Sequence, residues 1–151
     1  MQPLGERIIG AWRLESYTVQ GIDGEVRAPL GGDADGFIIY TADGHVSAQL
    51  MARSRPDYAS GNWLGGTSEE HHTAAAGYLA YSGTYTVDEE TQTVRHHIAV
   101  SLFPNWVGET QVRLVQQEDD GLVLFPATEP GPQAQTIAWR RVAGAPGEAG
   151  R

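Results

Sequence analysis

Cysteine and lysine are both missing from this chain of 151 residues. Without cysteine there is no disulfide framework, no thiolate nucleophile and no cysteine-based zinc site. Without lysine there is no Schiff-base catalysis through a lysine amine. The ten basic residues are therefore all arginine, and with abundant glycine and alanine this composition is typical of a GC-rich bacterial genome.

Long apolar runs are also missing. No window approaches the roughly 18 continuous apolar residues of a membrane span, and no basic segment followed by an apolar run opens the chain. We therefore expect a cytoplasmic protein that does not enter a membrane. Positive charge is scarce as well: the formal net charge is −9 and the pI is about 4.8. Because this average field repels phosphate backbones, we expect no nucleic-acid partner.

Through most of the chain the apolar pattern has a period of two, which predicts β-strands. In the first strand, for example, Trp12, Leu14, Ser16 and Thr18 alternate with Arg13, Glu15 and Tyr17. The predicted strands cover 11–20, 37–41, 45–51, 81–87, 92–102, 109–117, 121–126 and 133–142. Asp43-Gly44 predicts a tight hairpin between the second and third strands. Eight such strands without alternating helices predict an all-β fold, a closed antiparallel eight-stranded barrel whose interior holds one small ligand.

One segment breaks this pattern. Residues 52–66 have no clear period and contain proline, serine, asparagine and three glycines. They predict a long loop, which we expect to lie over one end of the barrel, as long ordered loops often cover a binding site. Thr67 and Glu70 then form a T-x-x-E capping box before an alanine run, which predicts one short helix of about ten residues. We expect a single domain, residues 1–142, and a disordered tail, 143–151.

Several stretches resemble known barrels. Gly10-Ala11-Trp12 matches the G-x-W motif that opens the first strand of lipocalins, and Trp139 and Arg141 stand where lipocalins place an arginine that packs across that tryptophan. The stretches "GFIIYTADGHVSAQL", "YLAYSGTYTVDEE" and "HHIAVSLFPNWVG" together resemble the bacterial lipocalin-like domain family of stand-alone barrels, over residues 6–142. The resemblance implies a lipocalin-like, calycin-type barrel that binds a small hydrophobic molecule; several related small barrels of secondary metabolism act as cyclases or isomerases.

Two adjacent histidines, His96 and His97, lie in the predicted strand 92–102. Neighbouring residues of a strand point to opposite faces, so the pair does not chelate one metal from a regular strand. His96 shares its face with apolar residues (Val94, Ile98, Val100 and Leu102), so we expect His96 to point inward, although a bulge before Pro104 would reverse this locally. A hydrogen-bonded wall histidine and a proton-transfer group are both open interpretations of His96.

Two tyrosines supply further candidate groups. Tyr81 and Tyr85 share a face around Gly83, whose missing side chain leaves room beside them. Their hydroxyl groups either donate to a ligand oxygen or pack against the wall with water partners. The candidate catalytic residues are therefore His96, Tyr81 and Tyr85, acting by acid/base chemistry without a cofactor.

The candidate ligand contacts lie at a barrel rim and on neighbouring strands. Pro104-Asn105-Trp106 ends a strand, so Trp106 and Asn105 would supply a flat apolar wall and an amide, or only cap the core and the turn. Arg113 is expected on the outer face because Val112 and Leu114 make the other face more apolar; an inward Arg113 would need an anionic ligand. His97, Tyr40 and Leu50 complete the ligand contacts.

No metal site is expected. His71 and His72 lie on the predicted helix outside any H-E-x-x-H motif, and a composite zinc site with His96 has no dedicated spacing. Two functions stay open: a carrier or sequestering protein for a small hydrophobic molecule, and a cofactor-free isomerase, cyclase or dehydratase acting on a polyketide- or terpene-like intermediate by confinement and proton transfer. A structural dimerisation module is a third alternative, and the sequence leaves a homodimer open.

Overall fold

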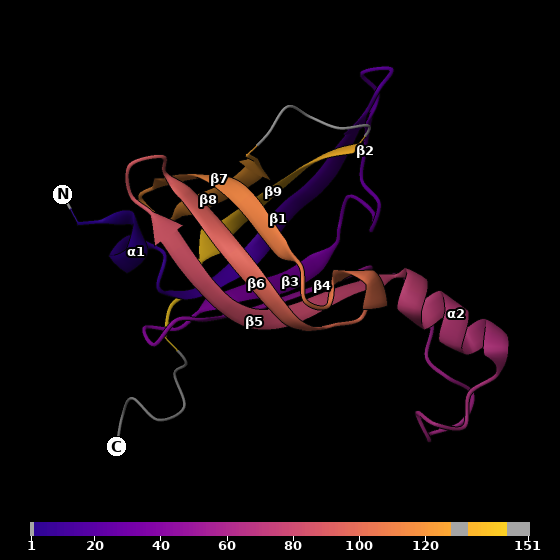
Figure 1. Cartoon of the computed structure of the whole chain (residues 1–151). Coiled ribbons are helices and arrows are strands. Elements are labelled where there is room, and N and C mark those ends of the chain that lie inside the picture. Colours follow the sequence, from indigo (N-terminus) through magenta and orange to yellow (C-terminus); the bar gives the residue numbers. More distant parts are fainter. Residues whose placement is uncertain (1, 128–132, 145–151) are drawn as a thin grey trace.

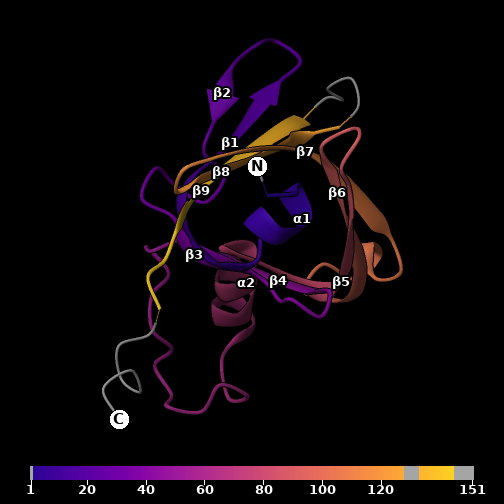
Figure 2. The ribbon, with the colours of Figure 1, turned by 90° about the vertical axis from the view of Figure 1, so that its left-hand side faces the viewer.

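The computed structural model of the chain describes residues 2–127 and 133–144. Its strands form one antiparallel sheet in the order β2-β1-β3-β4-β5-β6-β7-β8-β9, and β1 also pairs with β9, so eight strands close into a barrel (Figures 1 and 2). The strands are β1 (Gly10–Gly21), β2 (Val26–Arg27), β3 (Asp35–Tyr40), β4 (His45–Met51), β5 (Tyr78–Asp88), β6 (Thr93–Ser101), β7 (Thr110–Glu118), β8 (Gly121–Pro126) and β9 (Gln133–Arg141). The predicted closed antiparallel eight-stranded barrel is confirmed.

The helices agree only in part with the prediction. Helix α2 (Ser68–Ala76) begins at the predicted capping box: the Glu70 amide donates to Thr67 Oγ1 over 3.1 Å, and the Thr67 amide donates to the Glu70 carboxylate over 2.9 Å. One-turn helices α1 (Leu4–Arg7) and η1 (Pro104–Trp106) and the two-residue strand β2 were not predicted. Such short elements make too few repeats for a periodic pattern.

The floor of the barrel is built as the resemblance implied. Trp12 is fully buried, and its indole N–H donates to the Ile8 carbonyl over 2.9 Å. The Arg141 guanidinium lies 4.1 Å from the centre of the Trp12 ring and donates to the Ile9 carbonyl over 2.9 Å. Helix α1 lies across this opening (Figure 2), and its Leu4 is buried. This end of the barrel is therefore closed.

Two bulges overturn predicted strand faces. In β1 the register with β9 shifts between Leu14 and Ser16, so Tyr17 and Val19 are buried in place of Ser16 and Thr18. In β6 the register with β5 shifts opposite Ser82 and Gly83. Residues up to Ile98 keep the predicted parity, but Val100 is 61% exposed and Leu102 45% exposed. A bulge inserts one unpaired residue and so exchanges the two faces beyond it.

The predicted loop 52–66 does not lie over the barrel opening. With α2 it extends away from the barrel in Figure 1, and none of its residues lines the interior cavity described below. It is anchored at its start, where Arg53 Nη2 donates to the Asp35 carboxylate over 2.8 Å. No helix in the described ranges has both the length and the apolar character to cross a membrane. Most of the predicted tail, residues 145–151, lies outside the described residues.

Candidate functional site

His96 lies at the centre of a hydrogen-bonded row inside the barrel. Strand β6 directs it inward, where its side chain is fully buried, as its apolar neighbours predict. Its Nε2 atom is 2.7 Å from the Tyr40 hydroxyl of β3, and its Nδ1 atom is 2.8 Å from the Tyr81 hydroxyl of β5. Three strands thus contribute to one row, and both ring nitrogens of His96 have a tyrosine partner.

This row is neutral near physiological pH. Burial, aided by the positive charge of Arg113 and by His97, lowers the pKa of His96 from 6.5 to about 3. Burial raises the pKa of Tyr81 to about 12 and holds the pKa of Tyr40 well above its usual value. All three groups therefore stay uncharged between about pH 5 and 8, since these shifts move each titration out of that range.

A neutral imidazole carries one N–H, so one tyrosine donates to His96 and the other accepts from it. Tyr40 is completely buried, does not line the interior cavity and has His96 as its hydroxyl partner. If Tyr40 were the acceptor, its own O–H would be left buried without a partner, which costs about 1–3 kcal/mol. We therefore assign Tyr40 as donor to Nε2 and Nδ1–H as donor to Tyr81, which leaves the Tyr81 O–H free.

That free hydroxyl group belongs to a residue lining an interior cavity. The cavity lies at the end of the barrel opposite α1, and its volume is about 10 Å³, close to the space of one water-sized sphere. Its walls include Leu50, Tyr81, Trp106, Gln111, Arg113 and Trp139. Trp106 stands edge-on to Tyr81, with ring centres 6.0 Å apart. The barrel interior is packed almost completely at this end.

Arg113 was expected on the outer face, and this prediction is wrong. Arg113 pairs with Val94, which is fully buried, and residues directly opposite each other in a sheet share a face. Its guanidinium donates to Gln111 Oε1 over 2.8 Å and to the Val112 carbonyl over 3.1 Å. The more apolar face of β7 points outward, with Leu114 39% exposed. The usual apolar-inside rule fails because this barrel has a partly polar interior.

The other predicted site residues are dispersed. His97 is on the outer face, hydrogen-bonded to Thr86 and Thr110, and Asn105 is exposed on η1. Neither lines the interior cavity, so their proposed contact with an interior ligand is not supported by their positions. Tyr85 packs edge-on against Tyr40 and donates its hydroxyl to the Thr41 carbonyl over 2.8 Å, also outside the cavity lining. Of the predicted set, Leu50, Tyr81, Trp106 and Arg113 meet at the cavity, with His96 and Tyr40 behind Tyr81.

Sequence reasoning missed the cavity face of β9. Trp139 is buried and lines the cavity, and its indole N–H has no hydrogen-bond partner among the described residues. Gln135 of the same strand also lines the cavity. Alternation along the predicted strand 133–142 puts both residues on one face and could have identified them. Trp139 was instead interpreted only as part of the floor motif.

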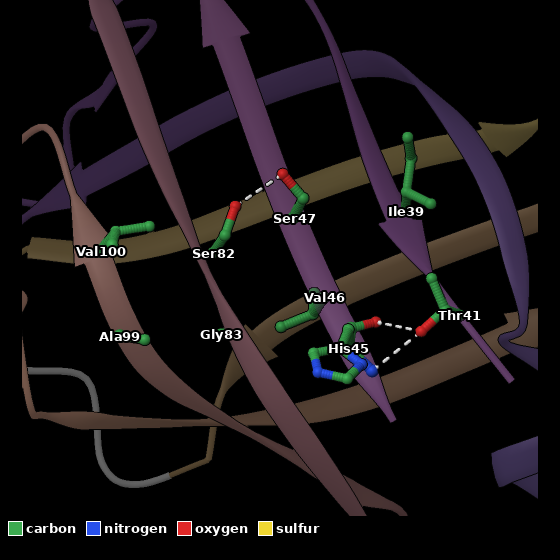
Figure 3. Close-up of a pocket in the computed structure, with 9 residues that line it drawn as sticks. All are labelled: Ile39, Thr41, His45, Val46, Ser47, Ser82, Gly83, Ala99 and Val100. Carbon is green, nitrogen blue, oxygen red and sulfur yellow. Dashed lines mark hydrogen bonds between the residues drawn. The ribbon is translucent and has the colours of Figure 1, made fainter. Parts of the chain in front are cut away.

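A larger hollow lies on the outside of the barrel. This outer groove, of about 350 Å³, crosses β3 to β6 and is lined by Ile39, Thr41, His45, Ser47, Ser82 and Val100, among others (Figure 3). Its walls are mainly apolar, and the Ser82 hydroxyl donates to Ser47 Oγ over 2.8 Å. Within residues 2–127 and 133–144, no three histidine, aspartate or glutamate side chains are grouped closely enough to hold a metal ion. The absence of a metal and a cofactor stays a prediction.

Comparison with known proteins agrees with this architecture. In an alignment 107 positions long, which covers 64% of this chain and 96% of the other protein, the chain is 36% identical to the 4'-hydroxy-3'-methoxypropiophenone carrier protein ppsC of the fungus Aspergillus oryzae. A bacterial source for this chain therefore stays an expectation from composition. The family model for the lipocalin-like domain matches residues 9–142, a range that includes every strand of the barrel, and the chain belongs to that family.

Proposed function

We propose that this protein is a carrier that binds a small aromatic molecule bearing oxygen substituents inside its barrel. The observation that carries the proposal is a set of polar groups, from Tyr81, Gln111 and Arg113, in the wall of an otherwise apolar interior. Ligand sites combine apolar walls with a few polar groups that fix orientation. The carrier protein of Aspergillus oryzae, 96% of whose length aligns with this chain, supports the same class of function.

Entry of such a ligand requires side chains to move. Sites for drug-sized ligands have volumes of about 300–1,000 Å³, far above the 10 Å³ present here. Trp106 is the side chain that we expect to move aside, because it lies on the short helix η1 at the rim and is only partly buried. Its packing against Tyr81 and Phe103 is edge-on, and a flat ligand in place of its ring would keep comparable contacts.

The outer groove is the competing site, and its chemistry is less suited to an oxygen-bearing ligand. It is larger, but it lies on an open sheet surface, and two of its polar groups, Ser47 and Ser82, already bond to each other. The interior instead has an indole N–H, that of Trp139, which has no hydrogen-bond acceptor in the described part of the chain. An enclosed site also buries more of the ligand surface, which favours binding.

The environment of His96 favours a carrier function over a catalytic one. A general base works best with a pKa near the operating pH, whereas the pKa of His96 is about 3. Both of its ring nitrogens are also engaged by tyrosines. Catalysis of an isomerisation or cyclisation by His96, Tyr81 and Tyr85 stays a prediction, and turnover that His96→Gln abolishes without loss of binding would support it.

Isothermal titration with 4'-hydroxy-3'-methoxypropiophenone tests the carrier proposal. Ala48 and Ser47 are neighbours on β4, but Ala48 is buried and lines the cavity whereas Ser47 lines the outer groove. We expect wild-type binding, a loss of at least about tenfold in affinity for Ala48→Leu and a change within about twofold for Ser47→Leu. Absence of wild-type binding, or the reverse order of the two variants, would overturn the proposal.

A further inference from the structure

We infer that the barrel interior selects the anionic form of its ligand, an aromatic oxyanion such as a phenolate, because Arg113 brings an uncompensated positive charge to a cavity rich in hydrogen-bond donors. This inference rests on the proposed function, since it specifies the ligand of the same cavity. It adds the charge state of the ligand that the cavity favours, and it names Arg113 as the residue that determines this preference.

The charge on Arg113 has no carboxylate partner in the described part of the chain. Its two hydrogen-bond acceptors, Gln111 Oε1 and the Val112 carbonyl, are neutral. The ion pairs found among the described residues involve Arg13, His45, Arg53 and Arg140. Asp35, the one buried carboxylate described there, is bound by Arg13 and Arg53. Arg113 is partly buried, and a partly buried cation is stabilised by a hydrogen-bonded anion, which a ligand in the cavity would supply.

The field of Arg113 extends through the interior. It lowers the pKa of His96 and opposes the rise in the pKa of Tyr40 and Tyr81 that burial causes. Each of these effects has the sign expected when a positive charge favours the less positive form of a neighbour. A ligand phenol beside Tyr81 would therefore experience the same field, and its ionised form would be stabilised.

Besides Arg113, the cavity lining includes two hydrogen-bond donors, from Trp139 and Tyr81, and two glutamine amides that each carry a donor and an acceptor. The Trp139 indole N–H is buried without a partner among the described residues, and the Tyr81 O–H is free under the tautomer assigned above. With the guanidinium of Arg113, these groups offer N–H and O–H donors of the kind that surround an oxyanion. A neutral ether oxygen satisfies such donors less well, because hydrogen bonds to an ionised acceptor are stronger.

Selection must be local, because the protein as a whole repels anions. Its formal net charge is −9, and the other polar residues that line the cavity, Tyr81, Gln111, Gln135 and Trp139, carry no charge at neutral pH. Arg113 is the one charged residue among the described residues that line the cavity. Replacing it should therefore remove the preference for an anion, whereas replacing an arginine on the outer face should not.

The test uses three one-ring probes that are smaller than the propiophenone, so that their entry requires less movement of side chains. 4-Nitrophenol turns yellow when it ionises, 4-nitroanisole is its neutral methyl ether, and 4-nitrobenzoate carries a carboxylate in place of the phenol. Absorbance titrations against pH, with and without excess protein, give the apparent pKa of bound 4-nitrophenol. We expect that pKa to fall by at least about one unit, which corresponds to a tenfold preference for the phenolate, and 4-nitroanisole to bind about tenfold more weakly than the phenolate.

Two variants test whether the shift in the apparent pKa of bound 4-nitrophenol depends on Arg113. Arg113→Met should abolish the shift and leave the affinity for 4-nitroanisole within about threefold of wild type, whereas Arg95→Met, on the exposed face of neighbouring β6, should keep the shift. If Arg113→Met does not fold, as judged by circular dichroism, Arg113→Gln serves in its place: it removes the charge but keeps a polar side chain, so the shift should disappear, and a shift that persists would overturn the inference.

The outcomes separate this inference from the carrier proposal. Equal binding of 4-nitrophenol and 4-nitroanisole, with no shift in the phenol's pKa, would overturn the anion selection and leave the carrier proposal standing. Failure of all three probes and of the propiophenone to bind would overturn both. Tighter binding of 4-nitrobenzoate than of the phenolate would support the selection of an oxyanion and would identify a carboxylate as the preferred anionic group.

Discussion

The imidazole of His96 is held neutral by its place in the barrel. Two tyrosine hydroxyls engage its nitrogens, and burial lowers its pKa from 6.5 to about 3. When the chain unfolds, the imidazole regains its ordinary pKa and takes up a proton at any pH between these values. Because the unfolded state binds more protons there, stability is fully present above pH 6.5 and is lost as the pH falls toward 3.

Replacement of His96 by glutamine should remove this pH dependence. We expect the wild-type free energy of unfolding to decline by up to about 1.4 kcal/mol per pH unit from this group alone, and His96→Gln to lack that contribution. The variant should also be about 1–3 kcal/mol less stable at pH 7, because it loses well-formed buried hydrogen bonds. Urea unfolding between pH 4 and 7 measures both effects. Tyr81→Phe keeps the imidazole and should keep the slope; an identical slope in wild type and His96→Gln would contradict this account.

At the scale of the strands, Gly83 allows β5 and β6 to approach at the bulge. The sequence suggested that its missing side chain left room beside Tyr81 and Tyr85, but the structure fills that room with backbone: an added Cβ would lie 1.9 Å from the His97 carbonyl oxygen. Gly83→Ala should therefore lower the free energy of unfolding by about 3 kcal/mol, at the upper end for overpacking. Gly32→Ala, with no heavy atom within 4 Å, should change it by less than about 0.5 kcal/mol. Thermal or urea unfolding compares the two, and equal stabilities would contradict the close approach.

Asp35 joins the barrel to the long loop. Its carboxylate bonds to Arg13 of β1 over 2.6 Å and to Arg53 of the loop over 2.8 Å, and the bond to Arg13 is the main cause that lowers the pKa of Asp35 to about 2. A lowered carboxyl pKa adds stability above the ordinary value of 3.8, and that stability is lost as the pH falls toward 2.

Asp35→Asn should release the loop. We expect a loss of about 1 kcal/mol at pH 7, small because both arginines are half exposed, and no further loss from this group as the pH falls below 4. Trypsin should cleave after Arg53 faster in this variant than in wild type, whereas Asp57→Asn, an exposed position within the loop, should leave the rate unchanged. Cleavage at equal rates in all three proteins would show that Asp35 does not anchor the loop.

At the scale of the whole molecule, the barrel could be predicted because its strands repeat a period of two and are separated by turn residues. The floor followed from the G-x-W motif, and Trp12 and Arg141 do stack. What could not be predicted was register. The bulge in β1 had no sequence signature and misplaced Tyr17, whereas a bulge before Pro104 was left open but its position beyond Ile98, which misplaced Val100, could not be predicted.

The candidate site was predicted less well for a related reason. His96 was placed correctly by parity against its apolar neighbours, a rule that holds where the interior is apolar, and Tyr81 was identified from the face that it shares with Tyr85 around Gly83. Arg113 was misplaced by the same rule, because the inner face of β7 is polar and only its pairing with buried Val94 reveals its direction. A polar interior reverses the hydrophobic pattern that defines a strand's inner face, so the residues that distinguish this cavity were the hardest to assign.

Both proposals require that the ligand binds inside the barrel and not in the larger groove outside it. A crystal structure of the protein with 4'-hydroxy-3'-methoxypropiophenone would locate the ligand. We expect ligand density between Tyr81 and Arg113, with an oxygen atom of the ligand within hydrogen-bond distance of the guanidinium and the Trp106 ring displaced toward the rim. Ligand density in the outer groove between Ile39 and Val100, with the interior packed as described here, would contradict both proposals.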